Sequence, residues 1–358
     1  MKEKANSMKK YEALREELLE FIQKNGLKQN DQLPKVRDII QNIGYSYATV
    51  NRTLIEMEKE GLITKRQGKG LYVNRIYPKQ KNKQVALIIP KDFSIHRIFL
   101  DILSGVRKAL EKEHIGLLVS ISNMSHEKEK ETVENLMSHN VDGMIIFLED
   151  HYRDDYSHIV ELKNNKFPFV LIDRFIENLD TDYVIINNRD AMFRVCSYLK
   201  YNRHCDKIIF VPANDTSVLV SSSDEKLMGY KEALHVLYGN DQGIILPLEE
   251  FIENLNAISS SHKNIGVCLN HDTMIPDMHK RLQELNLKIP PNCHIFGYNN
   301  SYDQPYYPTV EQFNDLAGMK AAEILIEKMK NPDAPSVRVR LEPKLILPDQ
   351  KGGYYMED

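Results

Sequence analysis

From residue 84 to residue 348, short runs of apolar residues alternate with longer segments whose apolar residues recur every three or four positions. A continuous apolar run is typical of a strand buried on both faces of a parallel sheet, and the longer periodicity is typical of a helix packed on it. The expected strands are VALIIP, GLLVSIS, DGMIIFL, FPFVLID, KIIFVPA, GIILP, IGVCLN, HIFGYN and VRVRLEPKLILP. This alternation predicts a doubly wound α/β fold. Because about 275 residues follow residue 83, we expect two lobes of roughly 100–130 residues each.

The first 74 residues follow another pattern, in which helices precede a pair of short strands. Apolar residues at helical spacing predict a first helix over residues 8–24, and KVRDIIQNIGYS predicts a short second helix. A third helix is expected to begin at Tyr47, because Ser46 is a good N-cap residue, and to end at Gly61. The β-prone pieces LIT and LYV follow, with a basic, glycine-rich turn between them. This order predicts a helix-turn-helix followed by a hairpin.

Charge separates these two parts of the chain. Residues 1–83 contain 18 Lys and Arg and 10 Asp and Glu, a net charge of +8, so the remainder of the chain carries −12. A basic module is expected to meet a polyanion, which an acidic module would repel. The polar, basic segment NRIYPKQKNK has the composition of a linker. We therefore expect a polyanion-binding domain at residues 1–74, a linker at 75–83, and the α/β domain at 84–358.

Several classes of protein are disfavoured by what the sequence lacks. No apolar run approaches the ~20 residues of a membrane helix, and the charged start MKEKAN is not followed by the apolar stretch of a signal peptide. We therefore expect a cytoplasmic protein with no membrane partner, whose four cysteines are reduced and buried. Neither a GxxxxGK[ST] phosphate loop nor a G-x-S-x-G elbow is present, so no cofactor and no enzymatic activity are expected. His271 has no second His or Cys at ligand spacing, so no metal site is predicted.

The third expected helix and the hairpin carry side chains suited to DNA. In a helix-turn-helix, the second helix enters the major groove and presents the side chains near its N-terminus to base edges. Arg and Asn can each form two hydrogen bonds to a base, while Ser and Thr suit phosphates. A basic hairpin alone would be ordinary surface, but after these helices its charges and glycines suit a wing that approaches the DNA backbone. The candidate DNA contacts are Arg37, Ser46, Tyr47, Thr49, Asn51, Arg52, Lys65, Arg66, Gly68 and Lys69.

The stretch LPKVRDIIQNIGYSYATVNRTLIEMEKEGLITKRQGKGLYV, residues 33–73, resembles the winged-helix domain of the gluconate-repressor (GntR) family of bacterial regulators. The resemblance implies DNA contacts at Arg37, Ser46, Thr49 and the wing tip Gly68. The sequence departs from the family pattern at Tyr47 and Asn51, where arginines are usual, and Arg52 moves the basic contact by one position. The operator sequence of the family is therefore not expected to carry over.

Residues 84–347 resemble the effector domain of the lactose-repressor and galactose-repressor family, which has the type I periplasmic-binding fold. The resemblance rests on IFLDILSGVRKAL, FPFVLIDRF, SSDEKLMGYKEAL, CLNHDTMI and IFGYNNS. It implies a sugar site between the lobes. Asp173 and Arg174 lie at the C-terminal end of an expected strand, a position that suits bidentate hydrogen bonds to sugar hydroxyls. A local salt bridge between these two residues is the alternative. The ligand candidates are His96, Phe99, Asp173, Arg174, Lys226, His271, Asp272 and Asn299.

Four of these candidates differ from the family pattern, since His96, Lys226, His271 and Asn299 stand where Asn, Arg, Asn and Asp are usual. The pocket is therefore expected to be polar and aromatic without copying the glucose or ribose pattern.

Taken together, the two parts are similar to the arabinose-repressor type of hybrid regulator. This implies a homodimeric, sequence-specific regulator that represses carbohydrate-utilisation genes and binds a near-palindromic, double-stranded operator. The expected effector is a sugar, either a monosaccharide such as a pentose or deoxyhexose or a sugar phosphate. The alternative is a sugar-binding protein of transport or chemosensing type, which would need a signal sequence and would give no role to the basic N-terminal domain.

Overall fold

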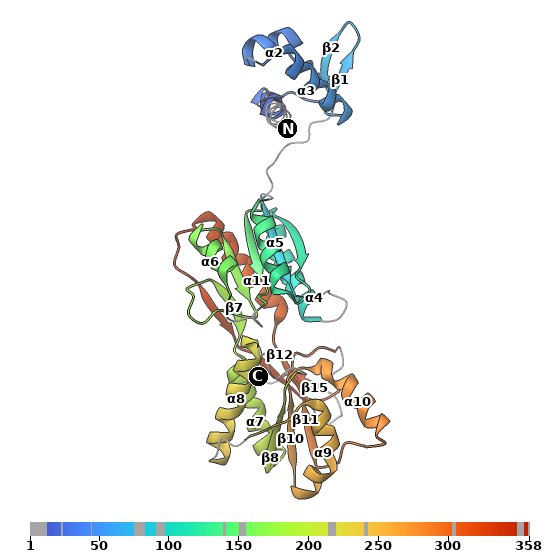
Figure 1. The fold of residues 1–358 in the computed structure, drawn as a ribbon, viewed down its shortest axis with the longest axis vertical. Helices are drawn as coiled ribbons and strands as arrows, with labels where there is room; N and C mark the ends of the chain where they lie inside the picture. Colours follow the sequence, from blue (N-terminus) through green and yellow to red (C-terminus); the bar gives the residue numbers. More distant parts are fainter. Residues whose placement is uncertain are drawn as a thin grey trace. The chain divides into compact units, whose positions relative to one another are not determined.

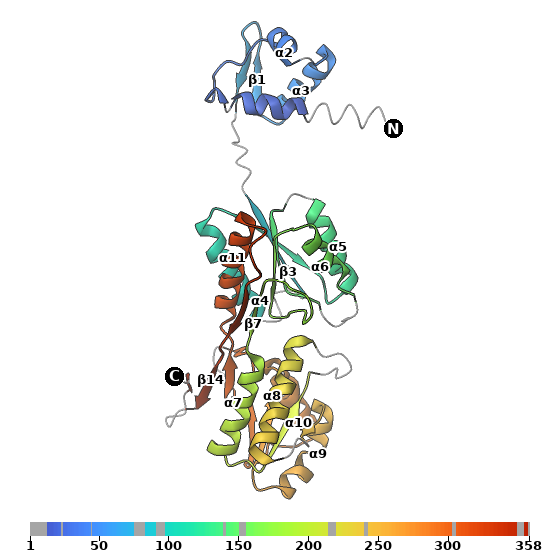
Figure 2. The same cartoon turned by 90° about the vertical axis from the view of Figure 1, so that its left-hand side faces the viewer.

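The computed structural model divides the chain into two compact units, Met1–Lys81 and Asn82–Asp358, and each is described by itself. Figures 1 and 2 show both units as ribbons. The structure describes residues 13–22, 24–43, 45–74, 83–90, 97–138, 141–149, 155–213, 220–239, 243–302, 306–348 and 354–356. Most of the predicted linker at 75–83 therefore lies outside the described residues. No helix in the described part is long and apolar enough to cross a bilayer.

The first unit is a helix-turn-helix followed by a hairpin, as predicted (Figure 1). The first helix was expected at residues 8–24. Within that range the structure describes residues 13–22 and residue 24, and all of these are helical. The other elements are α2 (Val36–Ile43), α3 (Tyr47–Lys59), β1 (Ile63–Arg66) and β2 (Gly70–Val73), and the two strands pair antiparallel. Leu14, Leu18, Val50, Met57 and Val73 lie in the core that joins the helices to the hairpin.

The hairpin is tied to the chain that precedes α2. The amide of Leu33 donates to the carbonyl oxygen of Leu71 at 2.9 Å, and the amide of Asn30 donates to that of Val73 at 2.7 Å. The wing therefore has a backbone connection to the helical part on one of its edges. Gly61 ends α3 with φ of +72°, a conformation that favours glycine.

The first lobe of the second unit is built on a six-stranded, fully parallel sheet. Its strands, in spatial order, are β13 (Arg338–Leu341), β7 (Tyr183–Ile186), β6 (Phe169–Ile172), β5 (Gly143–Ile146), β3 (Gln84–Ile89) and β4 (Gly116–Ile121). One face is covered by α4 (Arg97–Lys112) and α11 (Asn314–Lys330), and the other by α5 (His126–Ser138) and α6 (Ser157–Asn164).

Helices α4 and α11 approach each other closely because glycines lie at their crossing. A Cβ atom on Gly105 would lie 1.9 Å from the carbonyl oxygen of Asp315, and one on Gly318 would lie 2.2 Å from that of Ile102. Because each added Cβ would meet backbone atoms of the other helix, no flexible side chain could move away to make room for it. The contact therefore requires glycine at both positions.

The second lobe has a four-stranded parallel sheet and a small antiparallel one. The parallel order is β11 (Cys293–Phe296), β10 (Ile265–Leu269), β8 (Lys207–Val211) and β9 (Ile244–Ile245), and the antiparallel order is β12 (Thr309–Glu311), β14 (Lys344–Pro348) and β15 (Tyr354–Met356). One face carries α7 (Asn188–Asn202) and α8 (Ser221–Tyr238), and the other α9 (Leu248–Ser261) and α10 (Ile275–Glu284). A short 3-10 helix, η1 (Asp272–Met274), precedes α10. The predicted two-lobed α/β architecture is confirmed.

The chain passes between the lobes three times. It leaves the first lobe after β7, returns between β12 and α11, and leaves again between β13 and β14 (Figure 2). The expectation of one continuous strand in VRVRLEPKLILP is therefore wrong. The segment is split at Glu342 and Pro343, where β13 has paired with β7 of the first lobe and β14 goes on to pair with β12 of the second. Pro343 has no amide hydrogen to donate to a ladder, which suits a strand boundary.

Candidate DNA-binding and effector sites

The start of α3 is fixed by a hydroxyl cap. Ser46 Oγ accepts a hydrogen bond from the Thr49 amide at 3.3 Å and lies 2.9 Å from Thr49 Oγ1. The two hydroxyls predicted to contact phosphates are therefore bonded to each other. This cap satisfies an amide at the helix N-terminus and sets where the following side chains point.

The outer face of α3 presents the candidates for base contacts. Tyr47 is 65% exposed, Arg52 is exposed and Asn51 is half-buried. Val50 and Met57, on the opposite face, are fully buried. Arg37 is exposed on α2, the first helix of the pair. The sequence and the helical period together give α3 an apolar inner face and an outer face able to donate hydrogen bonds.

The wing tip is held in shape by contacts from outside the hairpin. Arg66 donates to Asn30 Oδ1 at 2.6 Å, and its guanidinium lies 4.3 Å from the centre of the Tyr72 ring. Gln32 Nε2 donates to the carbonyl oxygen of Lys69 at 2.7 Å. Arg66 is thus partly engaged in bracing the wing.

The remaining wing candidates lie at the tip. The side chains of Lys65 and Lys69 are exposed. Gly68 has φ of +72° with open space beside its Cα, and Gly70 has φ of +107°. This backbone favours glycine, as the sequence predicted for a tip that approaches another chain closely.

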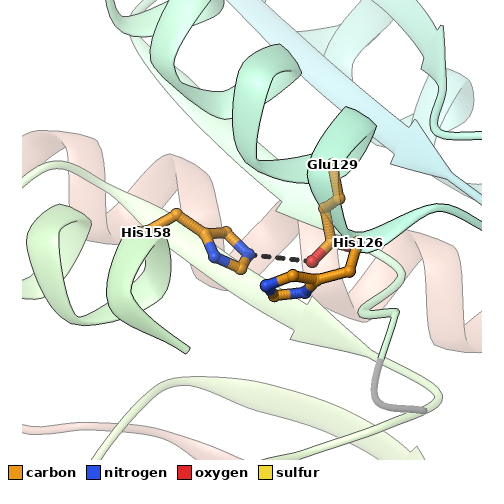
Figure 3. Close-up of side chains that lie close together, drawn as sticks. All are labelled: His126, Glu129 and His158. Carbon is orange, nitrogen blue, oxygen red and sulfur yellow. Dashed lines mark hydrogen bonds and ion pairs between the residues drawn. The ribbon is translucent and has the colours of Figure 1, made fainter. Parts of the chain in front are cut away.

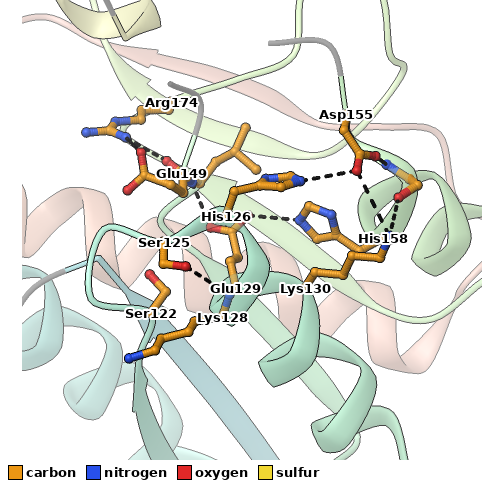
Figure 4. A network of polar contacts seen from close by, with 12 residues as sticks. Ser122, Ser125, His126, Lys128, Glu129, Lys130, Glu149, Asp155, His158 and Arg174 are labelled. Carbon is orange, nitrogen blue, oxygen red and sulfur yellow. Dashed lines mark hydrogen bonds and ion pairs between the residues drawn. The ribbon is translucent and has the colours of Figure 1, made fainter. Parts of the chain in front are cut away.

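In the first lobe, Asp173 and Arg174 follow β6. Asp173 has φ of +66°, a strained conformation for this residue, at a strand end of the kind where such sheets bind ligands. Arg174 is only 8% exposed, donates to the carbonyl oxygen of Leu148 at 2.8 Å, and lies 3.7 Å from Glu149 Oε1. Its Nε lies 3.8 Å from Asp173 Oδ2. The local pair that was the alternative interpretation is therefore present. Arg174 also belongs to a wider polar network through Glu149 (Figure 4).

The predicted aromatic contact is part of the same region. Phe99 is 6% exposed in the core of the first lobe and meets Phe147 edge-on at 5.3 Å between ring centres. The Arg174 guanidinium lies 5.0 Å from the centre of the Phe147 ring. Phe99 thus supports Phe147 beneath Arg174. His96, the neighbouring candidate, lies outside the described residues.

In the second lobe, Lys226 is 5% exposed within α8. Its ammonium donates to the carbonyl oxygen of Asn270 at 2.9 Å and lies 4.0 Å from the centre of the Tyr298 ring. Burial lowers the pKa of Lys226 to about 8, while Asp173 and Asp272 favour its charged form. Charged groups of both lobes therefore act on this one ammonium.

Asp272 holds the loop that follows β11. Its carboxylate accepts from the Tyr298 amide at 2.7 Å, the Ser301 amide at 3.1 Å and Thr309 Oγ1 at 2.8 Å. Burial raises the pKa of Asp272 to about 6. With its oxygens so engaged, Asp272 positions the loop.

That loop carries the last candidate, Asn299. Its φ is +90°, and its Oδ1 is buried with no hydrogen-bond partner in the part of the chain that the structure describes. A buried acceptor of this kind is costly unless something donates to it. His271, nearby in sequence, has Nδ1 2.5 Å from Thr273 Oγ1.

The structure thus brings Asp173, Arg174 and Asp272 into the electrostatic surroundings of Lys226. Sequence reasoning missed Glu149, Asn270 and Tyr298, which contact these candidates. Asn270 and Tyr298 directly precede His271 and Asn299 in the chain. Their position at strand ends was the signal that could have found them.

Comparison with known proteins finds matches to described families in both units. Residues 10–73 match the family of bacterial regulatory proteins of gntR type. Residues 82–245 match the periplasmic binding proteins and sugar binding domain of the LacI family, and residues 201–347 match a periplasmic binding protein-like domain.

Individual relatives match most or nearly all of the chain. The chain is 23% identical to the arabinose metabolism transcriptional repressor of Geobacillus stearothermophilus, over 97% of this chain and 98% of that one. It is 23% identical to the transcriptional repressor PurR of Vibrio campbellii, over 71% and 77%. Among solved structures, a LacI-family regulator from Enterococcus faecium with bound ribose superposes with a TM-score of 0.59 at 22% identity, over 74% of this chain and 96% of that one. The chain thus joins a helix-turn-helix domain that matches the gntR family of bacterial regulatory proteins to a two-lobed domain that matches periplasmic-binding-protein-like domains of LacI type.

Proposed function

We propose that this protein represses carbohydrate-utilisation genes and that a sugar bound between the two lobes controls its affinity for operator DNA. One observation carries the proposal: a helix-turn-helix with a wing and a two-lobed domain that matches the sugar binding domain of the LacI family occur in one chain. The arabinose repressor that aligns along nearly the whole chain and the ribose-bound regulator support a sugar as effector.

For the DNA-binding unit we assign base reading to the outer face of α3. Arg52 and Asn51 have the side chains that bond guanine and adenine, and Tyr47 is 65% exposed beside them. Lys65 and Lys69 of the wing supply charge to phosphates irrespective of sequence. Ser46 and Thr49 act through the cap that aims α3, and Arg66 acts mainly by holding the wing.

For the effector we favour a compact molecule with several hydroxyls. Asn299 offers a buried acceptor, Lys226 and Arg174 offer donors, and Asp173 offers a carboxylate at a strand end. A pentose or deoxyhexose presents donors and acceptors on both faces of its ring, which suits this set. A sugar phosphate is the alternative effector, since two cationic side chains are present. A binding protein for transport or chemosensing would give no role to the winged unit.

The coupling we propose is a change in how the lobes meet. An effector held by residues of both lobes favours one lobe arrangement, and the three chain crossings are the segments that would bend. In a homodimer, such a change would alter the spacing of two winged units on a near-palindromic operator. A coupling free energy of about 1–3 kcal/mol would change operator affinity roughly 5–150-fold.

The test begins with DNA selected from a random pool by the full-length protein. Fluorescence anisotropy then measures affinity for a selected duplex with arabinose, fucose, ribose or their phosphates added. We expect at least one of these compounds to change the affinity at least fivefold. Selective DNA binding that no sugar alters would refute the sugar effector, and failure to enrich any DNA would refute the regulator.

A further inference from the structure

A second group of polar side chains lies in the first lobe, where α5 meets α6. His126 and Glu129 are one helical turn apart at the start of α5, so they share a face of that helix. His158 lies in the first turn of α6. Figure 3 shows the two imidazoles and the carboxylate pointing toward one another. All three are buried, with Glu129 fully enclosed and His158 only 1% exposed.

The spacing of the donor atoms suits a metal ion. One ligand atom from each of the three residues lies within 4.8 Å of the others. His158 Nε2 lies 2.9 Å from Glu129 Oε1, and His126 Nε2 lies 3.3 Å from Asp155 Oδ2. A tetrahedral zinc ion with bonds of about 2.0 Å separates its ligands by roughly 3.3 Å. Small side-chain shifts would therefore bring the donors of His126, Glu129 and His158 to one ion, with Asp155 as the carboxylate next to His126.

We propose that His126, Glu129 and His158 bind a divalent transition-metal ion, with Zn²⁺ as the reference ion and Asp155 as the fourth ligand. Two imidazoles with carboxylates form a set that first-row transition metals prefer over Mg²⁺ and Ca²⁺, which favour oxygen ligands throughout. The site is distinct from the proposed sugar and DNA contacts, and its test needs neither ligand.

Charge favours an ion over a plain hydrogen-bonded cluster. The carboxylates of Glu129 and Glu149 are both fully buried, and Asp155 adds a third nearby. Apart from the two histidines, which are charged only when protonated, the cationic side chains that the structure places beside them are Arg174, next to Glu149, and Lys130, 4.0 Å from Asp155. A buried carboxylate is costly without a compensating charge, which a divalent cation between Glu129 and the histidines supplies.

Hydrogen bonding around the cluster points the same way. The amide of Glu149 donates to Glu129 Oε2 at 2.6 Å, which leaves Oε1 aimed at the histidines. Metal-binding carboxylates are commonly oriented by such an outer bond. Among the described residues none forms a hydrogen bond with His158 Nδ1. Nε2, which faces Glu129, is thus the atom through which the His158 ring is hydrogen-bonded in the described part of the chain.

The cluster also adjoins the proposed effector residues. Glu149 links the two, since its amide bonds Glu129 and its carboxylate lies 3.7 Å from Arg174 (Figure 4). Glu149 would thus lie between an ion bound at Glu129 and Arg174, which we assign to the sugar.

The test is a Zn²⁺ titration of chelator-treated, full-length protein by equilibrium dialysis with metal analysis. We expect Glu129→Gln and His158→Gln to lose one Zn²⁺ equivalent, or to bind it at least tenfold more weakly than the unmodified protein. His235→Gln, a change of the same type at an exposed position of α8, serves as the matched control and should bind Zn²⁺ like the unmodified protein. Circular dichroism checks that each variant is folded.

Two further measurements keep the test decisive if a buried variant fails to fold. Co²⁺ bound to the unmodified protein should show the intense visible bands of a four-coordinate site. Asp155→Asn, at a half-exposed carboxylate, should weaken Zn²⁺ binding by several-fold without unfolding the lobe. Equal Zn²⁺ binding by the unmodified protein and the folded variants, or Co²⁺ bands typical only of six-coordination, would overturn the proposal.

Discussion

The winged-helix unit and the effector domain present their candidate residues in opposite ways. On the winged unit, Tyr47, Arg52 and Lys69 are exposed on elements that are adjacent in sequence. In the effector domain, Arg174 and Lys226 are at most 8% exposed, and each already bonds a backbone carbonyl. On the proposed assignments, DNA would meet a surface that is ready to bind, whereas an effector would have to exchange existing contacts for its own. Under the proposed coupling, that exchange would let a ligand change the arrangement of the lobes.

The same contrast decides what the sequence predicts well. Helix α3, its Ser46 cap and the wing are specified by neighbouring residues, so their pattern is legible along forty positions. The effector region is assembled from strand ends far apart in the chain. Asp272 was predicted to bind ligand, yet it accepts three hydrogen bonds that hold the loop around Asn299. Phe99 was assigned to the sugar, yet it packs in the core against Phe147.

Other features of the structure were not predicted, because an apolar pattern in the sequence does not show which elements pair or pack together. The split of one apolar segment into β13 and β14 depends on which lobe each half pairs with. Helix α11 was not predicted. It packs on one face of the first lobe after the chain has passed through the second lobe. His126, Glu129 and His158 come from two helices, so ligand spacing within one segment could not reveal all three.

The largest effect is expected from Gly318→Ala, which should lower the stability of the effector domain but not that of the winged-helix unit. The added Cβ would lie 2.2 Å from the backbone oxygen of Ile102, so we expect the effector domain to lose about 3 kcal/mol in its free energy of unfolding. Chemical denaturation monitors this loss. Gly116→Ala is the matched control, because its nearest neighbour would be at an ordinary 3.5 Å. Equal stability of the two variants would contradict the tight α4–α11 crossing.

Arg174→Ala tests the buried side of the comparison. Losing a charged donor should weaken effector binding by about 1.5–3 kcal/mol, or roughly 10–150-fold, while affinity for selected DNA without effector is retained. Calorimetry with the effector identified by the anisotropy screen measures the first quantity, and anisotropy measures the second. A variant that responds to the effector as the unmodified protein does would remove Arg174 from the site.

Arg52→Ala tests the exposed side. We expect affinity for the selected DNA to fall by about 1–3 kcal/mol, with little change for unrelated DNA, because a base contact carries the sequence preference. Competition anisotropy with both duplexes measures the difference. Lys59→Ala, at the far end of α3, is the control and should leave sequence preference unchanged. A uniform loss on both duplexes would show that Arg52 contacts only phosphate.

The smallest effect is expected from Lys69→Ala at the wing. The wing bonds from Gln32 and Tyr72 use the backbone oxygen of Lys69, so the hairpin should persist without the side chain. Affinity should fall about equally for all DNA sequences, and the slope of log affinity against log salt should shrink by about one. A change in sequence preference instead would mean that the wing reads bases.

The most direct test of the account measures operator affinity and effector affinity in the same two variants. Arg52→Ala should weaken operator binding and bind the effector normally, while Arg174→Ala should bind the operator normally and bind the effector more weakly. The account would be contradicted if either variant lost both activities while remaining folded, or if effector binding left the operator affinity of the unmodified protein unchanged.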